Sequence, residues 1–585
     1  MDKNRIAERA REYAAREKEP VFRAEVEALL AAGTPESDKE LEDRFYRHLE
    51  FGTGGLRGII GGGYNRMNTL VVKSATQGLA AYLKKAFPAR AAAGGLSAVI
   101  AYDSRHYSAG FARAAAAVFA GNGIRVSLFS AMRPTPELSF AVRRLGADTG
   151  IVVTASHNPP QYNGYKAYWN DGSQVIPPHD RGIIDEVNGV TEILEAPYEA
   201  ALSKGLVRLI DREIDEPYQA MVKANLFRPE LIRSAAGGVK IVYTPLHGTG
   251  AMHVEKVLGD LGLTVITVPE QREGNGDFPT VAFPNPEEAA ALEMAIALGK
   301  KEGADVVMAT DPDADRFGAA VPANSPEGGG EFVLVTGNQM GVLLGDYIFL
   351  SLKETGRMPP KPAMVNTIVT TGMQRRVAES YGARCFECLT GFKWIASLIR
   401  KNESGGADIV YGTEESYGYL VGSEVRDKDG VSAAALTAEM TLYWRSQGKS
   451  LLDRLDELYL RHGYWQEMGI SRYFQGPEGP GIMKGIMENY RKEPPAALGG
   501  IAVTRVRDLK NGAGGLPPSD VLQFYLEDGT VVSARPSGTE PKIKFYATCC
   551  TELESPGPEG LAAARRGAKR KLAAIEKDIR AVIGG

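Results

Sequence analysis

Residues 146–159, "GADTGIVVTASHNP", decide the fold, because their construction returns twice further along the chain. The two parallels are "GADVVMATDPDADR" at 303–316 and "GADIVYGTEESYGY" at 406–419. Each passage consists of a turn, a short apolar run and then polar residues. An apolar run of this length between turn signals is typical of a strand covered on both faces, as in parallel sheets with crossover helices. A fourth passage, "GVKIVYTPLHGTG" at 238–250, starts in the same way but lacks an obvious catalytic tail.

Segments of helical character separate these apolar runs. Residues 108–123, "SAGFARAAAAVFAGNG", and 286–305, "PEEAAALEMAIALGKKEGAD", are rich in alanine and closed by glycine. Strands that alternate with helices predict an α/β architecture, repeated about three times here.

The two ends of the chain differ from this pattern. The first 50 residues predict helices packed on the first domain. Past residue 450, "LLDRLDELYLRHG" predicts an amphipathic helix, and residues 521–548 predict antiparallel strands around a hairpin signal at Asp528-Gly529. We therefore expect three similar α/β domains with mostly parallel mixed sheets and a C-terminal α+β domain. Their expected limits are 1–210, 211–325, 326–450 and 451–585.

Length and composition indicate a multidomain protein that acts on a small molecule. A chain of 585 residues is too long for one core. Its 44% hydrophobic and 24% charged residues are ordinary for a soluble globular protein. The 68 basic residues nearly balance the 72 acidic ones, and no long basic run points to nucleic acid.

The N-terminus has no secretion signal, and no apolar stretch is long enough for a bilayer, so we expect a cytoplasmic protein without a membrane partner. Four cysteines cannot form a disulfide framework. A zinc site at the C-x-x-C of Cys385 and Cys388 would need two more ligands at sensible spacing, so buried structural residues are the preferred interpretation.

Three aspartates directly follow the apolar run "DVVMA". Asp311, Asp313 and Asp315 occupy alternate positions, which on an extended backbone puts three carboxylates on one side. That concentration of charge is costly unless a cation neutralises it, and it suits Mg²⁺ with an open position for a phosphate oxygen. An EF-hand is excluded, because Arg316 and Pro322 stand where that loop needs glycine and glutamate. The remaining alternative is a solvated acidic loop.

Ser156 poses a different problem. A nucleophilic serine normally needs a positioned base, and neighbours on an extended segment point to opposite faces, so His157 is an awkward base for it. The serine is either a plain loop residue or does chemistry that needs no triad. If its hydroxyl carries a phosphoryl group and a metal at the aspartates neutralises the charge, the loose transition state requires no such base.

Four further motifs are individually weak. "RPSGTEPK" at 535–542 can form an anion cradle, with Lys542 and Lys544 adding charge, or can be a plain turn. The glycine-rich "FGTGGLRGIIGGG" at 51–63, with Arg57 at its centre, matches neither nucleotide-binding pattern. "TGFKWI" at 390–395 and "GTEESYG" at 412–418 offer polar groups suited to a sugar, or are surface loops.

Taken together and in order, "TASHNPPQYNGYK", "TDPDADR", "GTEESYG" and "RPSGTEPK" resemble the motifs of the α-D-phosphohexomutase family. The resemblance runs from about residue 45 to nearly the end, and "TGFKWI" and "EESYGYL" look most like the branch of bacterial α-phosphoglucomutases and phosphopentomutases. It implies four domains in a heart-shaped arrangement, a sugar monophosphate as substrate, glucose 1,6-bisphosphate as activator, and a monomer or weak homodimer.

The resemblance also implies roles for the matching positions. Ser156 would be the phosphoserine and would bind one Mg²⁺ per chain together with Asp311, Asp313 and Asp315. The groups around the transferring phosphoryl would be Arg57, His157, Lys166 and Lys393. The groups that hold the sugar and its distal phosphate would be Glu414, Ser416, Arg535, Ser537, Gly538, Thr539, Lys544 and Arg316.

One position departs from the family pattern. Ser416 is followed by Tyr417 and Gly418, where the phosphomannomutase/phosphoglucomutase branch reads Ser-Gly-His. That histidine cannot be transferred, so Lys393 becomes the better candidate for proton transfer and mannose becomes a weaker candidate substrate.

We therefore expect a mutase that interconverts glucose 1-phosphate and glucose 6-phosphate through a 1,6-bisphosphate. Pentose or mannose phosphates are the near alternatives. A phosphatase with Asp311 as nucleophile is more remote, since a D-x-D after a strand also suits that chemistry. A non-catalytic sugar-phosphate binding protein ranks last.

Overall fold

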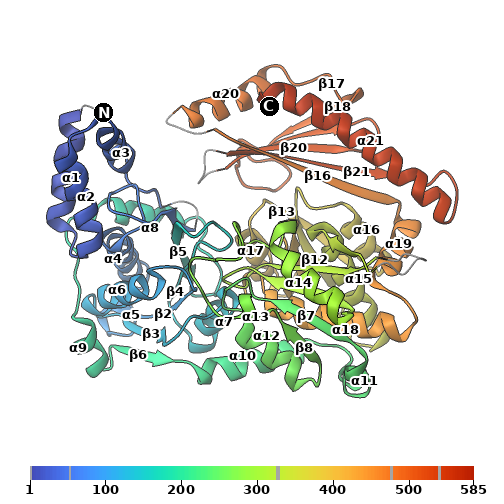
Figure 1. Cartoon of the computed structure of the whole chain (residues 1–585), viewed down its shortest axis with the longest axis horizontal. Helices are drawn as coiled ribbons and strands as arrows, with labels where there is room; N and C mark the ends of the chain where they lie inside the picture. The colour runs from blue at the N-terminus through green and yellow to red at the C-terminus, as the bar shows by residue number, and fades with distance from the viewer. Residues whose placement is uncertain (1–2, 52–53, 324–329, 475–477, 538–541, 585) are drawn as a thin grey trace. The chain divides into compact units, whose positions relative to one another are not determined.

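The chain folds into two compact units, shown in Figure 1. Unit 1 comprises Met1–Ala320 and Leu420–Ala438, and unit 2 comprises Val321–Tyr419 and Glu439–Gly585. The computed structural model describes residues 3–51, 54–323, 330–474, 478–537 and 542–584.

The first sheet of unit 1 has the strand order β1-β5-β4-β2-β3-β6. Strand β2 runs parallel to β3 and β4, whereas β5 runs antiparallel to β4 and β1. Every residue of β4 is buried, as its continuous apolar run predicts for a strand covered on both faces. The strands are Gly55–Ile59 (β1), Ser97–Tyr102 (β2), Arg125–Phe129 (β3), Thr149–Val153 (β4), Tyr162–Trp169 (β5) and Val207–Ile210 (β6).

Helices cover both faces of this sheet (Figure 1). The alanine-rich helix predicted at 108–123 is α6, which packs with α4 in one apolar core, while α7 lies on the other side. The N-terminal helices α1, α2 and α3 have a small core of their own, and Phe22 of α2 joins the main core, as predicted. These helices are Lys3–Arg16 (α1), Pro20–Ala32 (α2), Pro35–Phe45 (α3), Thr69–Ala86 (α4), Pro88–Ala92 (α5), Ser108–Gly121 (α6), Thr135–Leu145 (α7), His179–Asn188 (α8) and Tyr198–Ser203 (α9).

The second sheet repeats the design with the order β11-β10-β9-β7-β8, where β11 is Phe332–Val335, and its strands β7, β8, β9 and most of β10 belong to unit 1. Strand β9 is parallel to β7 and antiparallel to β10. The strands are Lys240–Thr244 (β7), Thr264–Thr267 (β8), Val306–Thr310 (β9) and Phe317–Pro322 (β10). The helices are Arg212–Ala224 (α10), Pro229–Ala235 (α11), Ala251–Asp260 (α12), Pro269–Arg272 (α13) and Ala289–Glu302 (α14), with a short 3-10 turn at Ala236–Gly238.

Unit 2 contains a third sheet with the order β13-β12-β14-β15, in which β12 is parallel to both β13 and β14. Its strands are Pro362–Thr367 (β12), Arg384–Cys388 (β13), Asp408–Glu414 (β14) and Gly418–Val421 (β15). The helices of this region are Gly337–Glu354 (α15), Met373–Ser380 (α16), Phe392–Asn402 (α17) and Gly430–Ser446 (α18).

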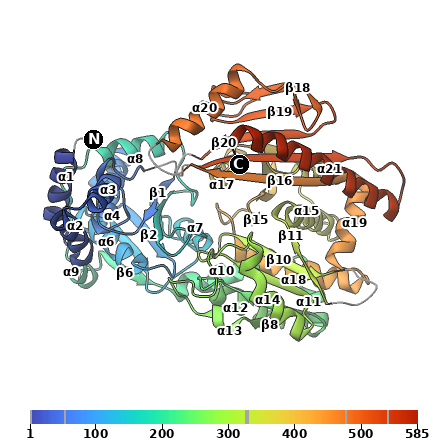
Figure 2. The ribbon, with the colours of Figure 1, turned by 45° about the horizontal axis from the view of Figure 1, so that its top comes forward.

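The C-terminal sheet has the order β16-β21-β20-β19-β18-β17 and is antiparallel throughout. Strands β18, β19 and β20 lie side by side in Figure 2, and the predicted hairpin joins β19 to β20 through Gly529, whose φ is 82°. The strands are Tyr464–Tyr473 (β16), Ala497–Leu498 (β17), Ile501–Asp508 (β18), Leu522–Leu526 (β19), Val531–Pro536 (β20) and Lys542–Thr551 (β21). The helices are Leu451–His462 (α19), Gly479–Lys492 (α20) and Pro558–Ile583 (α21).

The three repeated sequence passages occupy the same place in three sheets. Strands β4, β9 and β14 each lie parallel to a neighbouring strand, and each ends in a polar loop before the next strand begins. The prediction of three similar α/β domains and a C-terminal α+β domain is thereby confirmed. Among the helices of the described ranges, none combines the length and apolar character needed to cross a membrane.

Candidate active site

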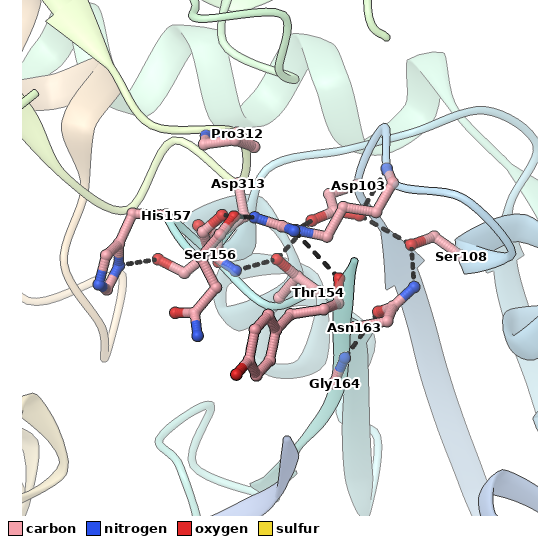
Figure 3. A network of polar contacts seen from close by, with 12 residues as sticks. Asp103, Ser108, Thr154, Ser156, His157, Asn163, Gly164, Pro312 and Asp313 are labelled. Carbon is pink, nitrogen blue, oxygen red and sulfur yellow. Dashed lines mark hydrogen bonds and ion pairs between the residues drawn. The ribbon is translucent and has the colours of Figure 1, made fainter. Parts of the chain in front are cut away.

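Ser156 lies directly after β4, in a loop that holds its hydroxyl in place (Figure 3). Its backbone has a φ of 52°, a left-handed conformation that is uncommon for a residue other than glycine. The Ser156 amide donates to Thr154 Oγ1 at 2.8 Å, and the Ser156 hydroxyl donates to Asp311 Oδ2 at 2.6 Å. The side chain is buried and fixed between two loops of unit 1.

The predicted geometry of His157 was wrong. The positive φ of Ser156 turns the chain, so the two neighbouring side chains do not point to opposite faces as they would on an extended strand. His157 Nδ1 lies 3.2 Å from Ser156 Oγ, within hydrogen-bonding distance. Figure 3 shows the imidazole and the hydroxyl facing each other. The histidine can therefore exchange a hydrogen bond with the serine oxygen.

The three aspartates converge, but not for the predicted reason. The loop after β9 is a turn, not an extended segment, because Ala314 has a φ of 51° and its amide donates to the Asp311 carbonyl at 2.9 Å. One oxygen from each of Asp311, Asp313 and Asp315 lies within 4.8 Å of the others, and all three side chains are buried. The alternate positions of the aspartates predicted that their carboxylates converge. In the structure, the turn at Ala314 brings them together.

Burial and neighbouring charges shift the pKa values of the aspartates in this cluster. Burial, Asp313 and Asp315 together raise the pKa of Asp311 well above its usual value. Burial also acts to raise the pKa of Asp315, but Lys166 and Lys428 outweigh it and leave that pKa lowered. An opposite charge is therefore what the site favours.

Lys166 of β5 supplies part of that charge. Its Nζ donates to Asp313 Oδ2 at 2.7 Å and to Asp315 Oδ2 at 2.9 Å. Burial alone would lower the pKa of Lys166, but the two aspartates raise it above its usual value, so the ammonium stays charged. Lys166 alone does not balance the three carboxylates.

The donor atoms fit a hard divalent cation. Asp313 Oδ1 and Asp315 Oδ1 are buried without a hydrogen-bond partner in the described part of the chain. Unpartnered buried carboxylate oxygens are costly, and oxygens of this kind are the ligands that Mg²⁺ and similar ions prefer. With Asp311 and the serine hydroxyl they form an all-oxygen set.

Lys428 was missed at the sequence level. It lies between Asp427 and Asp429 in "VRDKDG" (425–430), and its Nζ is 3.4 Å from Asp315 Oδ2. Contacts within unit 1 fix this segment: Tyr168 donates to Asp427 Oδ2 at 2.6 Å, and the Gly430 amide donates to the Ala314 carbonyl at 3.0 Å. The only signal was a run of alternating charges, which is usually a solvated surface.

Thr135, the first residue of α7, was also missed. Its amide donates to the Asp313 carbonyl at 2.9 Å and its hydroxyl donates to Asp313 Oδ2 at 2.7 Å. A helix N-terminus carries unpaired amides and partial positive charge, so α7 stabilises the loop that carries the three aspartates by hydrogen bonds and by its charge.

Two predicted arginines also lie in unit 1. Arg57 of β1 donates from Nη1 to Asn158 Oδ1 at 3.3 Å, which places it beside the serine loop. The Arg316 amide donates to Asp311 Oδ1 at 2.9 Å, and its guanidinium lies 3.6 Å from Glu287 Oε2.

The other predicted site residues lie in unit 2 or outside the described residues. Lys393 is the second residue of α17 and is buried, with Nζ 5.5 Å from the centre of the Trp394 ring. Glu414 ends β14, and Ser416 lies in the turn before β15. Arg535, Ser537 and Lys544 are described, whereas Gly538 and Thr539 lie outside the described residues.

Within unit 2, Arg535 and Lys544 lie within electrostatic range of the "GTEESYG" loop. Arg535 of β20 is the cross-strand partner of Lys544 on β21. Burial and Glu414 raise the pKa of Glu415, while Lys544 and Arg535 act in the opposite direction.

A second buried cluster of unit 1 is explained without a metal. His253 Nε2 lies 2.8 Å from Glu137 Oε2, and one oxygen of Asp215 lies within 4.8 Å of both ligand atoms. Arg133 already donates to both oxygens of Asp215, at 2.8 and 3.0 Å. Burial, opposed by His253, raises the pKa of Glu137 to about 7.

This shift predicts a pH-dependent stability. Since the folded protein binds the Glu137 proton more tightly than the unfolded chain does, stability should fall as the pH rises from about 4.5 to about 7, by about 3 kcal/mol in total. Glu137→Gln should remove this part of the slope. Urea unfolding at several pH values measures it, with exposed Glu293→Gln as the control. An unchanged slope in Glu137→Gln would mean that Arg133 and His253 keep the carboxylate ionised.

Comparison with known proteins agrees with this geometry. Four family models match the chain in order, described as phosphoglucomutase/phosphomannomutase alpha/beta/alpha domains I, II and III and C-terminal domain. They match residues 48–193, 216–324, 336–462 and 483–554.

Relatives match almost the whole chain. Phosphopentomutase of Homo sapiens is 36% identical over 565 residues, which is 92% of this chain and 90% of the relative. Phosphoglucomutase of Staphylococcus epidermidis is 33% identical over 529 residues, which is 88% of this chain and 93% of the relative. The crystal structure of Paramecium parafusin, a phosphoglucomutase in its open form, covers 92% of this chain and 96% of its own, with a TM-score of 0.69 and 17% identity. That last likeness concerns the fold alone.

Proposed function

Because this chain belongs to the phosphoglucomutase/phosphomannomutase family and is therefore an isomerase-class phosphomutase acting on phosphosugars, we propose that it interconverts α-D-glucose 1-phosphate and glucose 6-phosphate. The observation that carries the proposal is the hydrogen bond of 2.6 Å from Ser156 Oγ to Asp311 Oδ2. It joins the candidate phosphoryl carrier to the candidate metal loop.

In the proposed reaction, Ser156 carries a phosphoryl group. The free hydroxyl of the sugar monophosphate attacks the phosphorus, the bond to Ser156 Oγ breaks, and a 1,6-bisphosphate forms. The bisphosphate turns over, and its other phosphoryl group returns to Ser156. A divalent cation, proposed to be one Mg²⁺ per chain, would be held by Ser156, Asp311, Asp313 and Asp315 and would supply neutralising charge to the phosphoryl group.

Proton transfer and charge stabilisation come from the surrounding cations. Lys166 and Lys428 keep positive charge at the aspartates, and His157 can hydrogen-bond the serine oxygen. The sugar hydroxyl must lose a proton as it attacks, for which Lys393 is the candidate carrier. Arg57 would bind the transferring phosphate, and Arg316 would bind the substrate. The residues that would bind the sugar and its distal phosphate are Glu414, Ser416, Arg535, Ser537, Gly538, Thr539 and Lys544.

We further propose that glucose 1,6-bisphosphate activates the protein, that the protein is cytoplasmic, and that it is a monomer or weak homodimer. The proposed domain limits are 1–210, 211–325, 326–450 and 451–585.

Phosphopentomutase activity is the second candidate, because the human relative at 36% identity carries that name. Coupled kinetics with glucose, ribose and mannose 1-phosphates, in Mg²⁺ with trace bisphosphate, separate the candidates. We expect kcat/KM for glucose 1-phosphate to exceed that for the others by at least about tenfold, since a site that hydrogen-bonds a particular hydroxyl disfavours an analogue that lacks it. A higher kcat/KM for ribose 1-phosphate would replace the hexose assignment with the pentose one.

A further inference from the structure

The side chain of one arginine from another loop contacts the backbone of the loop that carries Ser156. Arg105 is the fourth residue of "YDSRHYS" (102–108), between β2 and α6, and its side chain is completely buried. None of the proposed steps assigns it a role. A buried guanidinium brings five N–H donors that must all be accounted for.

The four terminal N–H groups of Arg105 are used by backbone carbonyls of the loop after β4 and of the first residue of β5. Nη2 donates to the carbonyls of Ser156, at 2.5 Å, and Asn158. Nη1 donates to the carbonyls of Pro159, at 2.8 Å, and Tyr162, at 3.0 Å. Buried carbonyls need donors, and here one side chain donates to three in the loop and to one at the start of β5.

The arginine is itself held on its other sides. Its Nε lies 3.3 Å from Asp103 Oδ2, and the Phe278 ring lies over the guanidinium with its centre 4.9 Å away. The Asp103 carboxylate also accepts hydrogen bonds from Ser108 at 2.8 Å and Thr154 at 2.6 Å. Thr154 in turn accepts a hydrogen bond from the Ser156 amide (Figure 3). The serine is therefore tied to this network through its amide, and through its carbonyl by way of Arg105.

These ties explain how a strained serine conformation persists. A residue with a β-carbon at a φ of 52° is disfavoured unless its surroundings determine it. Hydrogen bonds fix both the amide and the carbonyl of Ser156, and in this conformation its hydroxyl donates to Asp311.

We propose that Arg105 is the positioning residue of the phosphoryl-carrying loop: by binding three loop carbonyls and the carbonyl at the start of β5, it holds Ser156 in the left-handed conformation that directs its hydroxyl to Asp311. This inference rests on the proposed function, because the position of the loop affects turnover only if Ser156 carries the phosphoryl group. A lysine could not replace the arginine, since three donors in a tetrahedral arrangement cannot serve four carbonyls that converge on a plane.

The test compares Arg105→Lys and Arg105→Ala with Arg113→Lys, an exposed arginine of α6 in the same domain. Amide hydrogen exchange of residues 154–163 is measured first, because it reports loop order without any assay of activity. We expect exchange there to accelerate by at least about tenfold in both Arg105 variants and to stay unchanged in the control. Unchanged exchange in folded Arg105→Ala would overturn the proposal, whatever the activity.

Kinetics then separate positioning from general destabilisation. We expect kcat of Arg105→Lys to fall about 10²-fold with KM changed less than about threefold, because a misplaced reacting group costs turnover more than it costs ground-state binding. Added guanidinium should raise kcat of Arg105→Ala by at least about tenfold, whereas sodium at equal ionic strength should not. Full kcat in folded Arg105→Lys, or equal effects of the two salts, would refute the positioning role. A wild-type protein without mutase activity would refute the proposed function instead and leave the exchange result standing.

Discussion

Replacing Ser156 with alanine is expected to lower mutase turnover by at least about 10⁴-fold while the protein stays folded. The alanine removes the only oxygen that can carry the phosphoryl group at this position, and no neighbouring hydroxyl shares its contact with Asp311 in the described part of the chain. The side chain is small and lies in a loop, so its loss should leave the cores intact. Coupled kinetics measure turnover, and circular dichroism verifies the fold.

The same variant separates the mutase from a phosphatase. Wild-type protein incubated with labelled sugar bisphosphate should carry acid-stable phosphate on Ser156, and Ser156→Ala should carry none. A matched exposed change, Ser203→Ala, should behave as wild type. If Ser156→Ala still releases phosphate and an acyl phosphate appears on Asp311, then the aspartate is the nucleophile and the serine route is wrong.

The central strands could be predicted because burial on two faces leaves a continuous apolar run in the sequence. The runs after Gly146, Gly303 and Gly406 became β4, β9 and β14 for that reason. Element ends were less predictable: α14 begins at Ala289, three residues after the start of the predicted segment at 286. Helix ends depend on local capping contacts that composition does not encode.

The candidate site was predictable where chemistry is concentrated in a few adjacent residues. Three carboxylates and a serine at strand ends were conspicuous, but the backbone that brings them together was not. Ser156 and Ala314 both adopt a positive φ, a conformation that a sequence indicates only where glycine occurs. Both arguments from extended geometry therefore failed, although the predicted residues lie together.

Residues that complete the site from distant parts of the chain could not be predicted. Lys428 reaches Asp315 from more than one hundred positions further along the chain, and Thr135 reaches Asp313 from nearly two hundred positions before it. A charged or hydroxyl residue in a polar segment is most often solvated, so its burial against a carboxylate appears only once the fold is known. Arg105 was hidden for the same reason, because its four partners are backbone carbonyls and carry no sequence signal.

Asp313→Asn is expected to lower turnover roughly 10³-fold and to weaken Mg²⁺ binding at least about tenfold. The change keeps the size of the side chain but removes one of three buried carboxylates, while Lys166 and Lys428 still contact Asp315. The side chain lies at the N-terminus of α7, where Thr135 still has an oxygen to which it can donate. The fold should therefore persist while the attraction for a divalent cation declines.

Isothermal titration with Mg²⁺ measures the loss without any assay of turnover. Bound Mg²⁺ should also raise the melting temperature of the wild type more than that of Asp313→Asn, because a ligand that binds the folded state more tightly stabilises it more at the same concentration. Asp260→Asn, at a partly exposed carboxylate paired with Lys223 and Lys256, carries the same chemical change away from the site and should match the wild type in both measurements. Wild-type Mg²⁺ affinity in Asp313→Asn would show that the three aspartates do not share a cation and would remove the basis for charge neutralisation at Ser156.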